Sequence, residues 1–299
     1  MCRFGKTGIY KAFMFGSPSI IVTTPDICRK VLIDDEHFKP GWPMSTEELI
    51  GRNSFIVIPS EDHKRLRKLT AAPINGHAAL SNYIEYIEDI SKTTLDKERV
   101  YLGGFRKGVH TLNHGLRAMA INIPGFAYHS ALKARKNLMA VLQAIIDERR
   151  AVRRDGVAIK AKRDMMDELL EVRDENGRKL SDEEIIDLLI MYLNAGHESS
   201  AHTIMWATVL VQQNPEIFQK AKDVVPKLGT FLPFGAGSRL CPGNDLAKLE
   251  FSIFLHYFLL GYRLERSNPE CPVQFLPHRR PKDACLARAS TCLLFYFRI

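Results

Sequence analysis

Residues 231–243 read FLPFGAGSRLCPG, and this stretch decides how the rest of the chain is interpreted. A single cysteine, Cys241, stands in it, directly before a stretch with helical spacing that opens at Asn244. A thiolate just before a helix N-terminus is favoured by the helix dipole and by the free backbone N–H groups, which suits the sulfur to bind a metal. We therefore expect Cys241 to be a metal ligand.

The other residues of the loop favour a haem iron as that metal. Gly235, Gly237 and Gly243 remove side chains where the backbone turns sharply or passes close to a flat macrocycle. Arg239 places a cation two residues from the sulfur, where a haem propionate needs a partner, and Phe234 can cover a macrocycle face. A buried cysteine in a glycine-rich turn is the commoner fate of a lone cysteine. A chance match to the pattern F-x-x-G-x-R-x-C-x-G is nevertheless on the order of one in ten thousand, so we favour haem.

This loop resembles the cysteine-ligand loop of the cytochrome P450 family, the haem-thiolate monooxygenases. The resemblance implies a mainly α fold with small β elements and a haem b cofactor. It also implies that Cys241 is the proximal ligand, that Arg239 contacts a propionate and that Phe234 is the aromatic side chain beside the iron.

A long helix is predicted from the capping box at residues 181–184, SDEE, to Gln213. Its interior contains residues 195–200, AGHESS, although glycine costs about 1 kcal/mol in a helix interior and buried unpaired polar groups cost more. A polar surface patch is one interpretation. The pattern is also similar to A-G-x-[D/E]-T-[T/S] of the family's oxygen-activating helix. That similarity implies that Ala195 and Gly196 leave a groove for dioxygen and that Glu198 and Ser199 relay protons, with serine where threonine is usual.

A basic helix is predicted after residues 60–62, SED, with Pro73 at its end. A solvated helix is the simplest interpretation. His63 and Arg67, at i and i+4, nevertheless resemble the family's W-x-x-x-R helix with histidine in place of tryptophan, which implies propionate binding. The remaining cations are candidates for docking an acidic electron donor, namely Lys64, Arg65 and Lys68.

Composition limits the alternatives. With 45% hydrophobic and 25% charged residues, the 299-residue chain has an ordinary globular composition and is long enough for one large domain or two small ones. The net charge of +8 is scattered and no nucleic-acid motif accompanies it, so nucleic-acid binding is not expected. Six cysteines without a C-x-x-C pair favour a reducing compartment. No apolar run is long enough for a membrane span, whereas the apolar residues 251–260 predict a buried helix behind the cysteine loop.

Several stretches resemble the plant ent-kaurenoic acid oxidase branch of the family, namely residues 63–76, 117–129, 195–200, 229–250 and 268–288. This resemblance implies stepwise oxidation of a diterpene acid in gibberellin biosynthesis, with dioxygen as co-substrate and electrons from NADPH through a separate reductase. It also implies membrane association at the cytosolic face of the endoplasmic reticulum. The family's N-terminal anchor is not found here, so a cytosolic chain is the alternative.

The chain also departs from the family pattern. Family members place an E-x-x-R helix, a sheet and an arginine-bearing loop between the oxygen-activating helix and the cysteine loop, yet only 33 residues separate Ser200 from Phe234. Residues 224–227, VVPK, are interpreted as a junction across missing sequence, and a second loss is expected near residues 97–104. We therefore expect one incomplete cytochrome P450-like domain over residues 1–299 that acts as a monooxygenase. The alternative is a non-catalytic truncated form that has lost productive haem binding.

Overall fold

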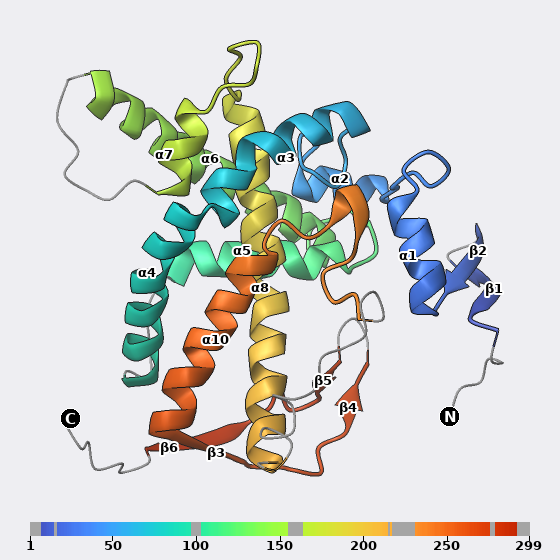
Figure 1. Ribbon diagram of the computed structural model, residues 1–299, viewed down its shortest axis with the longest axis vertical. Helices are drawn as coiled ribbons and strands as arrows, with labels where there is room; N and C mark the ends of the chain where they lie inside the picture. The colour runs from blue at the N-terminus through green and yellow to red at the C-terminus, as the bar shows by residue number, and fades with distance from the viewer. Residues whose placement is uncertain are drawn as a thin grey trace.

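A computed structural model describes residues 7–14, 17–96, 103–154, 164–214, 216, 231–275 and 279–291. The expected junction at residues 224–227 and most of the expected loss near residues 97–104 lie outside this part of the chain. The described fold is mainly helical with a few short strands, as the sequence predicts (Figure 1).

The helices are α1 (Pro25–Ile33), α2 (Met44–Ile50), α3 (Ser60–Asn75), α4 (His77–Asp96), α5 (Gly103–Leu116), α6 (Ala127–Arg154), α7 (Met165–Glu171), α8 (Asp182–Gln213) and α10 (Asn244–Gly261), with a short 3-10 turn η1 (Gly237–Arg239). The strands form three antiparallel pairs: β1 (Ile9–Met14) with β2 (Ser17–Val22), β3 (Tyr262–Arg266) with β6 (Ala287–Thr291), and β4 (Val273–Gln274) with β5 (Arg280–Pro281).

The long helix α8 organises the molecule. It begins at the predicted capping box, in which the Glu184 backbone N–H donates to Ser181 Oγ at 3.1 Å and the Ser181 N–H donates to the Glu184 carboxylate at 2.7 Å. It ends at Gln213, as expected. Figure 1 shows α8 running the length of the molecule with α10 beside its C-terminal half, while β3 and β6 cross the ends of both helices.

The hydrophobic core surrounds only the first part of α8. Its best buried members there are Ile185, Leu188 and Ile190, which pack with side chains of α2, α3, α5, α6 and α7. Between Met191 and Thr208, by contrast, no residue of α8 is buried. The polar centre of the long helix therefore lies outside the core.

A buried carboxylate of α8 joins this helix to α6 and to the loop that follows α2. Arg135 of α6 donates to Asp187 of α8 at 2.5 Å, and the backbone and side chain of Asn53 donate to the other oxygen at 3.1 and 3.0 Å. Gly51 has φ +110°, and a Cβ at this position would lie 2.2 Å from the Asp187 carboxyl group. Only glycine lets the end of α2 approach this carboxylate so closely.

Two expectations about helices are wrong. Pro73 does not end the basic helix, because α3 continues to Asn75 and α4 follows directly at His77. A proline in the last turn removes only one backbone hydrogen bond, and the helix tolerates that loss. The prediction that residues 251–260 form a fully buried helix is also wrong. α10 packs mainly against α3, α4, α8 and β3, and these elements leave Leu260 53% exposed.

None of the described helices is both long enough and apolar enough to cross a membrane.

Candidate active site

The cysteine loop connects η1 to α10. The Cys241 backbone N–H donates to the Phe234 carbonyl at 2.9 Å, and the thiol is half-buried and forms no disulfide. Gly235 and Gly237 have φ of +77° and +70°, the left-handed region in which glycine is favoured. The loop therefore needs glycine at two of the three predicted positions.

Contacts with α1 and α3 hold this loop in place. A Cβ on Gly237 would lie 2.3 Å from the Leu32 carbonyl oxygen, so the loop approaches the end of α1 through a bare backbone. Ser238 Oγ donates to Asp35 at 2.8 Å, and Asn75 Nδ2 donates to the Pro242 carbonyl. Gly243 differs from the other two glycines, since its φ is −92° and no described atom lies within 4 Å of where its Cβ would be.

Three predicted cofactor residues meet around a side chain that the sequence did not point to, Phe55. Arg239 donates to the Phe55 carbonyl at 2.6 Å, the Arg67 guanidinium lies 6.0 Å from the centre of the Phe55 ring, and the His63 ring packs edge-on against it at 5.6 Å. The structure thus brings α3 and the cysteine loop together as the resemblance implies. In the sequence, Phe55 belongs only to a short apolar run. Nothing local in the sequence shows that residues of α3 and of the cysteine loop contact it.

The electrostatics of this cluster disfavour a third cation. Burial lowers the pKa of His63 to about 4, and the charges of Arg239 and Arg67 add to that effect while Asp35 opposes it. His63 is therefore neutral at physiological pH. Burial also lowers the pKa of Arg239, with Arg67 contributing in the same direction and Asp35 opposing. The charges of two arginines are opposed here by only one nearby carboxylate, that of Asp35, so the local charge favours an anionic ligand.

Phe234 contacts α10 from inside the loop. The Lys248 ammonium group lies 5.7 Å from the centre of its ring, which places the ring against the helix that follows the cysteine. The aromatic side chain and Cys241 therefore stand on the same short loop, linked by the backbone hydrogen bond from Cys241 to Phe234.

The polar stretch of α8 has specific partners. Glu198 forms an ion pair with Arg117, which directly follows α5 and whose role the sequence did not reveal; the two side chains are 19% and 26% exposed. Ser199 Oγ donates to the Ala195 carbonyl at 2.6 Å. Ser200 Oγ donates to Glu250 of α10 at 3.0 Å, which ties this stretch to the helix that follows Cys241. No described atom lies within 4 Å of where a Cβ on Gly196 would be.

The residues present fit a haem. The cationic pair Arg67 and Arg239 suits two propionates, and Cys241 offers a thiol beside them. Buried amide oxygens of Asn75, Asn194 and Asn244 have no hydrogen-bond partner within the described residues. Asn75 belongs to α3, which carries His63 and Arg67, Asn194 lies beside the polar stretch of α8, and Asn244 begins α10 next to the cysteine loop, so three of the unsatisfied polar atoms lie on elements around the candidate site.

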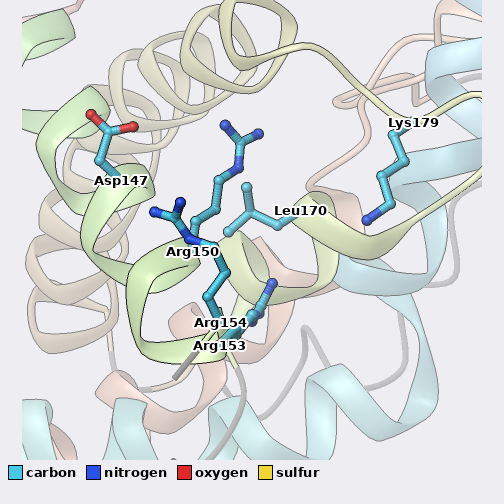
Figure 2. Close-up of a pocket in the computed structure, with 6 residues that line it drawn as sticks. All are labelled: Asp147, Arg150, Arg153, Arg154, Leu170 and Lys179. Atoms are coloured by element: carbon cyan, nitrogen blue, oxygen red, sulfur yellow. The ribbon is translucent and has the colours of Figure 1, made fainter. Parts of the chain in front are cut away.

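A separate cavity of about 580 Å³ contains none of these residues. Asp147, Arg150, Arg153, Arg154, Leu170 and Lys179 line it at the end of α6, beside α7 (Figure 2). Two of its arginines are already paired, because Arg150 binds Asp182 and Arg153 binds Asp167 at 2.9 Å. The ion pairs of these arginines join α6 to α7 and α8. The cavity is therefore not an alternative to the candidate site at Cys241.

One expectation about electron-donor docking is wrong. Arg65 is only 17% exposed and donates to Asp174 at 2.7 Å and to Glu184 at 3.0 Å, so its charge is already used within the protein. Lys64 is exposed. Lys68 pairs with Glu175, but both of these side chains are exposed to solvent. Of the three predicted docking cations, the two lysines therefore remain at the surface.

A helical fold in which a cysteine loop precedes a helix packed against a long, polar-centred helix is the arrangement expected of a haem-thiolate protein. The sequence model of the family Cytochrome P450 matches residues 105–226 and 225–283. The fold is similar to that of the retinoic acid-bound cyanobacterial CYP120A1, with a TM-score of 0.80 over 95% of this chain and 92% of that one, at 18% identity.

Curated relatives agree with this match. The chain is 47% identical to ent-kaurenoic acid oxidase 1 of Arabidopsis thaliana, over 96% of this chain and 84% of the relative. It is 40% identical to ent-kaurenoic acid oxidase of Oryza sativa subsp. japonica, over 95% and 81%, and 38% identical to 7,8-epoxymelianol synthase CYP88A51 of Citrus sinensis, over 96% and 83%. The chain belongs to the cytochrome P450 family, and is a haem-thiolate monooxygenase that receives electrons from a redox partner.

Proposed function

We propose that this monooxygenase oxidises an ent-kaurane diterpene acid, ent-kaurenoic acid, stepwise toward a gibberellin precursor. The observation that carries this proposal is the identity of 40–47% to four plant relatives that are each named as an ent-kaurenoic acid oxidase. The identity falls to 36–38% for three relatives that are named as synthases of other products.

The proposed haem ligand is Cys241. Arg239 and Arg67 hold the propionates, and His63 donates a hydrogen bond as a neutral imidazole, since its pKa of about 4 keeps it uncharged. When bound, haem would supply the activation of dioxygen for insertion into the substrate, and Cys241 would hold it through its thiolate. The clustering of all three side chains around Phe55 supports these roles.

The proposed proton path begins at Glu198 and Ser199. Ala195 and Gly196 keep the helix surface free of large side chains, and the Ser199 hydroxyl lies 2.6 Å from the Ala195 carbonyl. Arg117 fixes the Glu198 carboxylate through the ion pair, and the 19% of that side chain that remains exposed is its route for proton exchange with solvent. Ser199 stands one residue further along the helix and is the next donor in the relay.

The proposed redox partner is an NADPH-dependent reductase with an acidic surface, which Lys64 and Lys68 of α3 would meet. The proposed location is the cytosolic face of the endoplasmic reticulum membrane, in line with the plant relatives. These two statements rest on the family relationship and on the exposure of the two lysines.

We further propose that the chain forms one domain from which an internal segment is missing near residues 224–227. The family model matches two stretches that meet at residues 225 and 226. The alignment with the Arabidopsis relative runs over 410 positions although this chain has 299 residues, so more than a hundred positions of the relative have no counterpart here. The exposed apolar surface of α10 supports the same proposal.

The test is the carbon monoxide difference spectrum of the reduced, purified chain. A red-shifted thiolate Soret band in the wild type that is absent from Cys241→Ser supports the proposed ligand. A wild-type chain that folds and takes up haem without this band would contradict it and would favour the non-catalytic alternative, which none of the comparisons supports. Turnover of ent-kaurenoic acid with a plant reductase then tests the substrate.

A further inference from the structure

The hairpin of β4 and β5 is fixed against the C-terminal half of α8. Trp206 Nε1 donates to the Arg279 carbonyl at 2.8 Å, and the Arg279 guanidinium lies 5.5 Å from the centre of the Trp206 ring. The next residue, Arg280, is paired in register with Gln274 of β4. These contacts place Arg280 beside α8 near Trp206.

One face of α8 meets this hairpin. Glu198, His202 and Trp206 are spaced four residues apart and therefore lie along the same side of the helix. His202 Nδ1 lies 2.8 Å from the Glu198 carbonyl oxygen, and the Glu198 carboxylate pairs with Arg117. The face thus carries the proposed proton donor, a histidine and a tryptophan in consecutive turns.

Arg280 acts electrostatically on His202 of this face and on Arg117, the partner of Glu198. Burial lowers the pKa of His202, and the charges of Arg280 and Arg117 add to the effect. Burial likewise lowers the pKa of Arg117, and Arg280 is the neighbouring charge that contributes to the shift. Together with the contacts of Arg279 to Trp206 and the pairing of Arg280 with Gln274, these effects place Arg280 near His202 and Arg117.

The charges in this space do not balance. Arg117 is matched by Glu198, and Arg279 stacks on Trp206 and Phe275. Arg280 is half-buried and has no carboxylate partner within the described residues. A partly desolvated arginine that lacks a carboxylate is poorly stabilised, whereas a ligand carboxylate would satisfy it through two parallel hydrogen bonds.

We propose that Arg280 binds the carboxylate of an apolar polycyclic acid substrate beside the polar centre of α8, and so selects acids over neutral compounds. This inference rests on the proposed function, because it assigns a residue to recognition of the acid group. The guanidinium suits this task since its planar fork matches a carboxylate and stays charged at every physiological pH.

The experiment compares ent-kaurenoic acid with its methyl ester in the wild type, Arg280→Gln, Arg280→Lys and Lys282→Gln. The last variant removes an exposed cation two residues away and serves as the charge-matched control. Equilibrium dialysis gives Kd without any requirement for haem reduction, and steady-state turnover with a reductase separates KM from kcat.

The expected result is that Arg280→Gln raises Kd and KM for the acid about 10- to 100-fold. Values for the ester and for the Lys282→Gln control should remain within about twofold of wild type, kcat should change little, and Arg280→Lys should recover part of the acid affinity. In the wild type, added salt should weaken binding of the acid and not of the ester.

The inference would be overturned if Arg280→Gln bound the acid as tightly as wild type, or lost acid and ester affinity equally. Should that variant fail to fold by circular dichroism, equal wild-type affinity for acid and ester would overturn it instead. If the wild type shows the thiolate Soret band but binds the acid no more tightly than the ester, only this inference is contradicted. Acid-selective binding without the thiolate band contradicts only the proposed function.

Discussion

Ser200 on α8 donates a 3.0 Å hydrogen bond to the carboxylate of Glu250 on α10. This contact joins the helix with the polar centre to the helix that follows Cys241, two elements 50 residues apart in the chain. Burial raises the pKa of Glu250, and the hydrogen bond from Ser200 opposes that rise. The two halves of the candidate site are thus connected through a carboxylate that is costly to ionise.

Ser200→Ala should destabilise the protein at neutral pH by about 1 kcal/mol, because the Glu250 carboxylate loses a donor. A raised folded-state pKa gives a stabilising contribution at acid pH that is lost as the pH rises through that pKa. The cost of the substitution should therefore shrink in acid, where Glu250 is protonated. Urea unfolding at neutral and at acid pH measures it, with Ser252→Ala on the exposed side of α10 as the control. An equal cost at both pH values would contradict this reasoning.

His63→Gln should remove part of the acid sensitivity of the fold. The folded pKa of about 4 lies below the ordinary value of 6.5, so the neutral imidazole contributes stability above pH 6.5 that is lost as the pH falls toward 4. Thermal unfolding across this window should show a smaller decline in Tm for the variant than for wild type. His77→Gln, which changes an exposed histidine, should follow the wild-type curve.

Arg239→Met should weaken haem retention. The guanidinium spans the cysteine loop and the Phe55 carbonyl, and its charge is proposed to hold a propionate. We expect haem to be lost to an acceptor protein roughly tenfold faster than from wild type, equivalent to about 1.4 kcal/mol. Arg263→Met on the exposed side of β3 is the control. Equal rates of haem loss in all three proteins would exclude Arg239 as a propionate ligand.

Gly51→Ala should cost more than about 2 kcal/mol of stability, because its φ of +110° is strained for other residues and the new Cβ meets the Asp187 carboxyl group. Gly177→Ala isolates the backbone effect, since its φ is +75° and no described atom lies near the position of its Cβ, and should cost about 1 kcal/mol. Guanidinium unfolding gives both values. Equal losses would show that the core around Asp187 adapts freely.

The sequence predicts a structural feature correctly where all the residues that determine it lie within one helix or loop. The capping box at Ser181 and the stop after Gln213 placed α8 correctly, because caps are short-range chemistry. The three cofactor residues of α3 and the cysteine loop were predicted from motif resemblance, and the structure brings them together at Phe55. Their roles toward haem stay predictions.

Contacts between residues from distant parts of the chain could not be predicted from the sequence. Arg65 looked like a docking cation because nothing local shows that Asp174 and Glu184, more than a hundred residues away, pair with it. Arg117 and Arg280 lacked a signal for the same reason. The apolar run in α10 predicted full burial, since periodicity reports the character of a helix surface and not which elements are there to cover it.

The burial of α8 has a consequence for its motions. The helix has buried residues between Ile185 and Met191 and again at Thr208 and Val209, whereas no residue of the span between these two supports is fully buried. Backbone amides in the span that holds Glu198 should exchange with deuterium far faster than those at either support. Occupation of the site would slow exchange in that span, so isotope exchange would follow loading of the cofactor without any measurement of turnover.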